Sequence, residues 1–464
     1  MIKLLKKYYQ YLPVLLYLPS LFVFFSGDDW FHLRITQISS VKEFLNFFAF
    51  THNSQSAAFY RPLPTQVFFF VFQRFFGLTV WPHHLFVLIC FSYSLYLLYR
   101  FAVRELKSPN LAQLSVFIYA LSVSNFTRLY FLSAFQEVSL VIFALLCLLN
   151  FPKSGLKTLL FFILALLSKE TAVVIPLLLL LFNQKYLKQH LFSLLPVGLI
   201  LSAYLYFRLV VFGSAVGDSY LWNFSLLKAA NTLMWYLLWS FGAPELLVDY
   251  VGSGLKLVPK FFVDYPFWWG TIISLLLGTI STTAILFLQK LKKIDVSFLK
   301  YILFFFITIL PVLFLPSHKF ALELGLPLVG FSLALVWLLP KKLNRLAIIF
   351  LCLFAGLNIS MNYLSYTRHY SVSRGRLSQK IYIYLSEAYP VYPIGKYYNF
   401  VNDSQDFGLA WGQSKQISQT LSGSDFFRVY YHNPNLKVYY EDIPEATPAG
   451  QSPINLSTRQ FIAP

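Results

Sequence analysis

Long apolar runs separated by short polar gaps make up most of the chain before residue 362. Because a membrane-spanning helix needs about 20 mainly apolar residues, the runs predict an α-helical polytopic membrane protein with eleven crossings. The predicted spans cover residues 8–26, 82–103, 110–125, 128–150, 156–168, 171–183, 190–212, 266–289, 298–316, 320–339 and 345–361. The fifth and sixth are short and are separated by Lys169 and Glu170. We therefore predict two short helices that meet below the outer surface, with a simple outer turn as the alternative.

The polar gaps alternate in charge, which indicates how the chain is oriented. Six gaps are basic and contain Lys3, Lys6 and Lys7; Arg100, Arg104 and Lys107; Lys153 and Lys157; Lys185 and Lys188; Lys290, Lys292 and Lys293; and Lys341, Lys342 and Arg345. The positive-inside rule places them in the cytoplasm, with the N-terminus inside and the C-terminus outside. The basic start resembles a signal peptide but lacks a small-x-small cleavage site, so we predict an uncleaved first span. A plasma membrane is expected, with a prokaryotic inner membrane favoured.

Two regions depart from the spanning pattern. The first outer loop, residues 27–81, is predicted to contain an amphipathic helix across 30–50 and an interfacial run across 62–77. From residue 362 the chain becomes polar and rich in tyrosine. This change predicts a small extracytoplasmic α/β domain at 362–464 that follows a transmembrane domain at 1–361. Its strands are expected at 396–402, 425–432 and 437–441, with a helix across 407–421.

Composition agrees with a membrane protein. The 464 residues are 57% hydrophobic and 12% charged, with a mean hydropathy of +0.61. Soluble domains carry about 25% charged residues, and disorder needs low hydrophobicity, so both classes are excluded. The net charge of +18 follows from topology, since no basic stripe or nucleic-acid motif is present. The three cysteines, Cys90, Cys147 and Cys352, lie inside apolar runs, which predicts core packing rather than disulfides or metal binding.

The most distinctive polar feature is Asp28-Asp29, directly at the outer end of the first predicted span. Adjacent carboxylates at a membrane exit suit a general base or a metal ligand. His32 follows one helical turn later, so Asp28, Asp29 and His32 are a possible site for a divalent cation. The alternative is that the pair only ends the helix among lipid headgroups.

Several cations are also expected at the outer surface. Arg61, in Tyr60-Arg61-Pro62-Leu63, offers a bidentate fork to phosphate, although an interfacial Arg that snorkels to headgroups is the alternative. His318 and Lys319 lie in a short outer turn where an anion would arrive, and Glu323 is placed to pair with Lys319 at i+4.

One acid and one histidine lie near these cations. Glu137 is predicted about 15 Å below the outer surface, where an acid needs a partner, and Lys169 and Arg128 are the available cations. His84, at the start of the second full span, faces either the outer cavity or the aromatic belt. An acidic pair and cations on one side favour a lipid-linked phosphate substrate. No Gly-rich phosphate loop is present for a soluble nucleotide.

The order of these motifs resembles the GT-C integral-membrane glycosyltransferases that use polyprenyl-phosphate sugars, the group of protein O-mannosyltransferases and aminoarabinose transferases. The resemblance covers roughly residues 8–361. It rests on Asp28-Asp29, Tyr60-Arg61-Pro62-Leu63, His84, Ser168-Lys169-Glu170-Thr171 and the late outer turn at His318-Lys319, where eukaryotic relatives prefer Glu-Arg.

The resemblance implies inverting transfer of a sugar from polyprenyl phosphate to an acceptor hydroxyl of a protein, lipid or glycan. Asp28 or Asp29 would be the general base, and Asp28 is favoured. Phosphate-binding residues would be Arg61, Lys169, His318 and Lys319; His32, Tyr60, His84, Glu137 and Glu170 would line the substrate pocket. Some relatives use a divalent cation. The rival function is a transporter or lipid-linked-sugar flippase, which would show matching broken helices in the two halves of the chain. The third hypothesis is a non-catalytic membrane scaffold.

Overall fold

The computed structural model describes residues 8–57, 59–184, 187–213, 220–252, 256–405, 412–448 and 450–462. In these ranges six helical segments are long and apolar enough to cross a membrane. They are Trp81–Leu106, Leu132–Asn150, Leu194–Phe212, Trp269–Lys293, Val296–Leu313 and Arg345–Ala388. Four shorter apolar helices accompany them, at Pro109–Leu121, Gly155–Leu166, Glu170–Phe182 and Pro327–Leu338. A polytopic helical membrane protein is confirmed at this level, while the count of eleven crossings stays a prediction.

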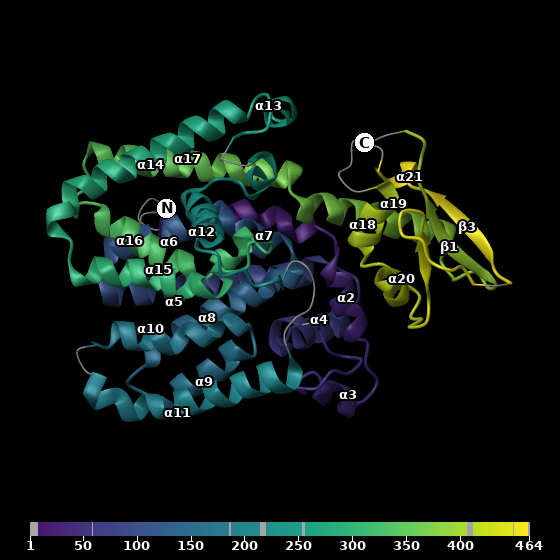
Figure 1. Cartoon of the computed structure of the whole chain (residues 1–464), viewed down its shortest axis with the longest axis horizontal. Helices are drawn as coiled ribbons and strands as arrows, with labels where there is room; N and C mark the ends of the chain where they lie inside the picture. Colours follow the sequence, from purple (N-terminus) through teal and green to yellow (C-terminus); the bar gives the residue numbers. More distant parts are fainter. Residues whose placement is uncertain are drawn as a thin grey trace.

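The apolar helices lie roughly side by side as a bundle, and the small sheet projects from one end of it (Figure 1). The bundle helices are α5 (Trp81–Leu106), α6 (Pro109–Leu121), α8 (Phe135–Asn150), α9 (Gly155–Leu166), α10 (Ile175–Phe182), α11 (Leu187–Tyr206), α14 (Trp269–Lys290), α15 (Val296–Leu313), α16 (Pro327–Leu338) and α17 (Arg345–Arg368). Helix α12 (Leu226–Phe241) also belongs to this part of the chain. Its short helical turns are η3 (Val123–Asn125), α7 (Phe126–Tyr130), η4 (Leu132–Ala134), η5 (Glu170–Val174), η7 (Phe207–Phe212), η9 (Glu245–Tyr250), α13 (Lys260–Asp264), η11 (Leu291–Lys293) and η12 (Ala321–Leu324).

The first apolar run forms η1 (Tyr9–Phe22), which is wound as a 3₁₀ helix of 14 residues with Pro13 and Pro19 inside it. A 3₁₀ helix rises about 2.0 Å per residue, so η1 extends about 28 Å. That length is close to the roughly 30 Å hydrocarbon core of a bilayer. An α-helix of the same 14 residues would be too short to cross it.

Among the described residues, basic gaps lie at the end of the bundle away from the sheet (Figure 1). Arg104, at the end of α5, donates a hydrogen bond to the carbonyl oxygen of Leu148, at the end of α8 (2.5 Å). Lys290, at the end of α14, likewise donates to the carbonyl oxygens of Trp337 and Leu339 (2.5 and 2.9 Å). The connection from α14 to α15 lies at the end of the bundle away from the sheet (Figure 1).

The two short helices predicted around Lys169 are present and run in opposite directions. At the end of α9 the carbonyl oxygen of Leu167 accepts a hydrogen bond from the Leu63 N–H in the first outer loop (3.3 Å). At the far end of α10, Phe182 packs on Phe101 near the basic end of α5 (5.2 Å between ring centroids). Lys169 therefore lies at a turn on the side of the first outer loop, and a single long helix across residues 156–183 is excluded.

The first outer loop contains α2 (Asp28–Ile35), α3 (Val41–Asn46), η2 (Pro62–Val67) and α4 (Phe68–Phe76). The expectation of one helix across residues 30–50 was wrong. Ser40 and Glu43 form a reciprocal capping box that starts α3 as a separate helix.

The C-terminal unit comprises α18 (Tyr370–Ala388), β1 (Lys396–Val401), α19 (Gln413–Leu421), α20 (Asp425–Tyr430), β2 (Val438–Tyr440), β3 (Ser452–Ser457) and α21 (Arg459–Ile462). The strands form a parallel sheet in the order β2-β1-β3, which confirms a small α/β unit. Helix α17 continues through the expected boundary at residue 361 as far as Arg368. The strand expected at 425–432 was wrong, because residues 425–430 form helix α20, which buries the adjacent Phe426 and Phe427 together, whereas adjacent side chains of a strand point to opposite faces. Of the helix expected at 407–421, residues 407–411 lie outside the described residues.

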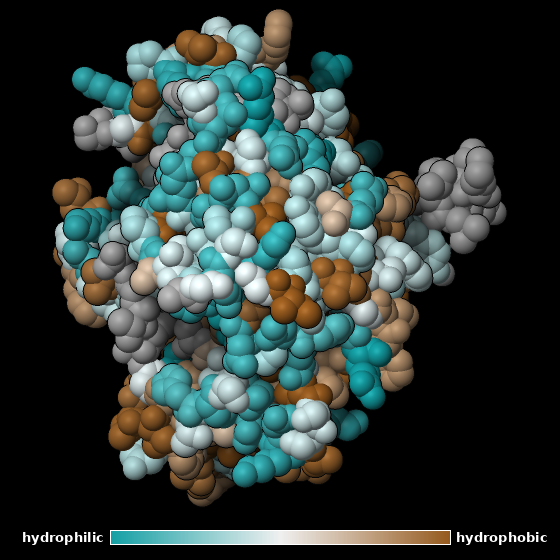
Figure 2. Space-filling model, turned by 90° about the vertical axis from the view of Figure 1, so that its right-hand side faces the viewer, coloured by the Kyte–Doolittle hydropathy of each residue, from teal (hydrophilic) through white to brown (hydrophobic). Residues whose placement is uncertain are grey.

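The C-terminal unit packs directly on α2, the helix that carries the acidic pair (Figure 1). The Gly27 N–H donates to the carbonyl oxygen of Thr420 (2.7 Å). The Trp30 indole N–H donates to Ser378 Oγ (3.0 Å), and Arg34 forms an ion pair with Asp425 (2.7 Å). Seen from the end that carries this unit, the surface is mostly hydrophilic (Figure 2).

We expect a cysteine introduced by Lys437→Cys, on the C-terminal unit, to react with an impermeant thiol reagent on intact cells. The matched substitution Lys292→Cys, at the basic end, should react only after lysis, because the positive-inside rule places that end in the cytoplasm. Both variants are made in a Cys352→Ala background, since Cys352 is exposed. Labelling of the Lys437→Cys variant only after lysis would reverse the orientation.

Candidate functional site

Asp29 has a structural role at the start of α2. It is 2% exposed, and its carboxylate accepts hydrogen bonds from the N–H of Ser26 (3.1 Å) and from the N–H and Oγ of Ser133 (2.8 and 2.6 Å). Burial raises the pKa of Asp29 to about 7, and these hydrogen bonds oppose the rise. Gly27 precedes the pair with φ 54° and ψ −125°, a conformation that favours glycine.

Asp28 is accessible to solvent, in contrast to its neighbour. The surrounding protein is nevertheless dense enough that burial raises the pKa of its carboxyl, while the nearby guanidinium groups of Arg374 and Arg61 oppose the rise. The Asp28 side chain is therefore open to solvent and closely surrounded by groups from other segments. The two adjacent carboxylates, which the sequence leaves equivalent, therefore have different surroundings. The Asp29 carboxylate binds backbone and side-chain groups of the protein, and the Asp28 carboxylate is open to solvent.

Partly accessible side chains that interact electrostatically surround Asp28, and we call them the outer polar recess. Its members are Asp28, Arg61, Tyr220, His318, Tyr370 and Arg374. They come from α2, the first outer loop, the segment before α12, the turn after α15, and α18. Asp28, Arg61 and His318, which the sequence singled out, are thus brought together with residues from the C-terminal unit.

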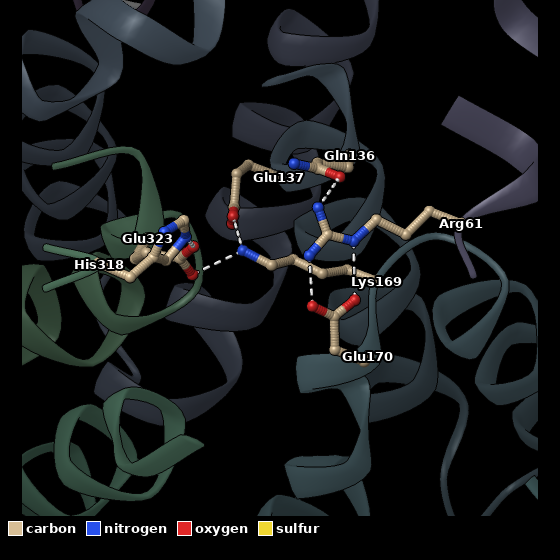
Figure 3. Close-up of polar contacts among 7 residues, drawn as sticks. All are labelled: Arg61, Gln136, Glu137, Lys169, Glu170, His318 and Glu323. Carbon is tan, nitrogen blue, oxygen red and sulfur yellow. Dashed lines mark hydrogen bonds and ion pairs between the residues drawn. The ribbon is translucent and has the colours of Figure 1, made fainter. Parts of the chain in front are cut away.

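Arg61 is already engaged by protein groups (Figure 3). Its Nε and Nη2 donate to the two carboxylate oxygens of Glu170, with 2.7 Å between Nε and Oε2. Its Nη1 donates to Gln136 Oε1 (2.5 Å). A bidentate pair of this kind fixes the plane of the guanidinium group, so Arg61 is a rigid wall of the recess.

Lys169 lies between two buried carboxylates (Figure 3). Its ammonium group is paired with Glu137 and with Glu323 (2.6 Å to Oε2). Lys169 is therefore the partner that the deep Glu137 was expected to need. With Arg61 and Glu170 included, two of the predicted phosphate-binding cations are opposed by three carboxylates.

The remaining outer cations are arranged differently from the expectation. The pair expected between Lys319 and Glu323 is absent, because Glu323 points to Lys169 and Lys319 donates to Asn231 Oδ1 (3.2 Å). His318 Nε2 lies 3.8 Å from Glu323 Oε1.

Three predicted pocket residues are buried outside the recess. The two ring nitrogens of His84 lie against the backbone carbonyl oxygens of Val23 and Leu129 (3.0 and 3.2 Å). Tyr60 donates to the carbonyl oxygen of Phe48 (2.9 Å). His32 is 7% exposed, and burial lowers its pKa to about 3, so it is neutral.

The possible metal site was not found in the described part of the chain. Across those residues, no three or more His, Cys, Asp or Glu side chains form a group that could hold a metal ion. The Asp29 carboxylate is turned toward Ser26 and Ser133, and a divalent cation at Asp28, Asp29 and His32 stays a prediction.

A small cavity lies next to the recess, lined in part by Thr127, Glu245 and His369. His369 Nδ1 accepts a hydrogen bond from the Ser371 N–H (3.3 Å), so in neutral His369 the proton is on Nε2, which faces Glu245 (3.6 Å). Tyr370, the residue after His369, interacts electrostatically with both Glu245 and Asp28, so it lies between the cavity residues and Asp28.

The sequence did not identify the functional candidates Arg374, Tyr370, Tyr220, Glu245 and His369. Arg374 and Tyr370 belong to the segment assigned to a separate domain, and no local motif marks them. In comparisons with known proteins, no family model, curated protein or solved structure matches the chain. The functional argument therefore starts from the recess itself.

Proposed function

We propose that the protein is a membrane glycosyltransferase that moves a sugar from a polyprenyl-phosphate donor to an acceptor hydroxyl on the extracytoplasmic face, with inversion. The observation that carries the proposal is the accessible Asp28 carboxylate in a polar recess with Arg61, Arg374 and His318. This recess lies at the end of a lipid-soluble bundle opposite the basic gaps. A lipid-anchored substrate reaches such a site without leaving the membrane surface.

In the proposed reaction, Asp28 takes the proton of the acceptor hydroxyl as its oxygen attacks the anomeric carbon of the donor. The bond between that carbon and the phosphate oxygen breaks, and its electron pair leaves with the phosphate. Cationic groups that face the phosphate stabilise this growing charge. Asp29, through Ser26 and Ser133, holds the backbone that positions Asp28.

The wider proposal is a GT-C-like bundle of eleven spans in a plasma membrane, a prokaryotic inner membrane being favoured. The N-terminus would be cytoplasmic and the C-terminal unit would lie outside. Acceptors of the proposed class are a protein, a lipid or a glycan. The contacts of Gly27, Trp30 and Arg34 hold the C-terminal unit beside Asp28, which supports a role for this unit in receiving the acceptor.

Transfer of a labelled sugar from polyprenyl phosphate in membranes that contain the protein is the direct test. We expect labelled product to form and to depend on the protein. Sealed vesicles distinguish the rival function, because a transporter or flippase moves the lipid-linked sugar without a new covalent product. Protein-dependent movement without product would overturn the proposal.

The rate of transfer should fall as the pH is lowered. Asp28 must be deprotonated to accept a proton, and burial raises its pKa above the ordinary value of 3.8. Activity is therefore full above the pKa of the folded protein and is lost as the pH falls through it, at a higher pH than for an exposed aspartate. A profile of kcat/KM against pH measures this loss of activity at low pH. The residual activity of Asp28→Asn should not show the same loss.

A further inference from the structure

Arg208 is a buried cation that the site described above does not include. It lies in η7, the π-helical turn that ends α11, and is 6% exposed. Its Nη1 atom has no hydrogen-bond partner, and no carboxylate of the described residues forms an ion pair with it. The Cζ atom of Arg208 lies 5.1 Å from the centroid of the Phe212 ring, but a buried charge that lacks an ion-pair partner is costly. π-helical turns are also frequent at functional sites.

Tyr204, one helical turn before Arg208, has the same character. It is 6% exposed, and its hydroxyl has no hydrogen-bond partner. It interacts electrostatically with Arg208, Arg61 and Glu170, so these groups are neighbours. Two unpartnered donors beside the rigid Arg61–Glu170 pair form a place for an anion.

Aromatic packing joins η7 to the first outer loop. Phe50 stacks on Tyr60 (4.0 Å between ring centroids) and on Phe207 (5.2 Å), and His52 Nε2 lies 2.8 Å from the carbonyl oxygen of Phe212. Because Tyr60 directly precedes Arg61, these contacts hold η7, and with it Arg208, on the side of the first outer loop where Arg61 lies.

The residues around Arg208 indicate how an anion would arrive. Its apolar neighbours in η7, Phe207, Leu209 and Val210, are 43%, 61% and 68% exposed. The segment Leu194–Phe212 is the least buried of the six candidate spans, at 17%. Arg208 therefore lies behind a surface that faces lipid, near the end of a span, where a lipid chain can lie alongside α11.

We propose that Arg208 and Tyr204 bind the phosphate of an isoprenoid phosphate whose chain lies along the lipid-facing side of α11. The inference rests on the proposed function and assigns its donor-phosphate site. It also explains how phosphate is held although Arg61 and Lys169 are opposed by three carboxylates. Arg208 and Tyr204 supply free donors in the place where the donor lipid enters.

Binding of polyprenyl phosphate to the purified full chain in detergent tests this assignment. We expect Arg208→Gln to weaken binding at least tenfold, Tyr204→Phe to weaken it less, and Arg208→Lys to retain part of it, because Lys keeps the charge but not the fork. Arg74→Gln removes an exposed outer cation and should leave binding unchanged. Circular dichroism and gel filtration check that each variant is folded; should Arg208→Gln not fold, Tyr204→Phe and Arg208→Lys decide.

Competing ligands identify the source of the phosphate. Polyprenol without phosphate, inorganic phosphate and phosphatidylglycerol should each compete poorly, because the site needs both the phosphate and the isoprenoid chain. Equal competition by phosphatidylglycerol would overturn the assignment in favour of a structural phospholipid. Wild-type affinity of a folded Arg208→Gln variant would also overturn it. If the wild type binds polyprenyl phosphate without transferring sugar, the proposed function fails and the binding site stands.

Discussion

Asp28→Asn is expected to lower sugar transfer by about 10²–10⁴-fold, the usual contribution of a general base. Asn has nearly the same shape as Asp but cannot accept the proton of the acceptor hydroxyl. Because Asp28 is solvent-accessible and lines the recess, its replacement should leave the thermal unfolding temperature nearly unchanged. Initial rates of transfer with saturating donor and acceptor, in membranes normalised for the amount of protein, measure the effect.

Asp29→Asn is the matched control, since the same chemical change is made one residue later. The Asp29 carboxylate accepts hydrogen bonds from Ser26 and Ser133. The NH₂ group of an asparagine would therefore face the N–H of Ser26 or of Ser133, and two donors cannot bind each other. We expect a lower unfolding temperature and a smaller loss of transfer per folded molecule. Full transfer by Asp28→Asn together with complete loss in a stable Asp29→Asn protein would reassign the base.

The helical bundle could be predicted because hydrophobicity is a local property of the chain. The apolar runs around α5, α14 and α17 each contain enough residues to form a span without help from neighbours. The partner of Glu137 could also be narrowed to two cations, because a deep acid requires one, and Lys169 is the partner found.

The rest of the site depends on contacts between residues that are distant in sequence. Trp30 meets Ser378 across 348 positions, and Arg374 reaches Asp28 only because α17 and α18 return the chain to α2. Spacing at i+4 suggested that Glu323 pairs with Lys319, but Phe320 is extended (φ −138°, ψ 139°). Since i+4 neighbours meet only in an α-helix, Glu323 turns instead to Lys169.

Replacing Lys169 with Met should have the largest effect on stability. Lys169→Met keeps the aliphatic length but removes the cation between Glu137 and Glu323, whose side chains are 1% and 6% exposed. Removing one partner of a buried ion pair costs about 3–5 kcal/mol, because the charge left behind is uncompensated. We expect lower yield in membranes and a clearly lower unfolding temperature in detergent, measured by differential scanning fluorimetry.

Two further variants separate the loss of charge pairing from the loss of packing. Lys319→Met removes a partly exposed lysine whose ammonium group donates a hydrogen bond to Asn231. This substitution should change the unfolding temperature little. Combining Lys169→Met with Glu137→Gln removes one of the stranded carboxylates, so the double variant should be more stable than Lys169→Met alone. A Cβ atom at Gly325 would lie 2.8 Å from Arg128 Nη1 and 3.0 Å from Glu137 Oε2, so the cluster is closely packed on that side. A double variant no more stable than the single one would mean that Lys169 acts through packing, not charge.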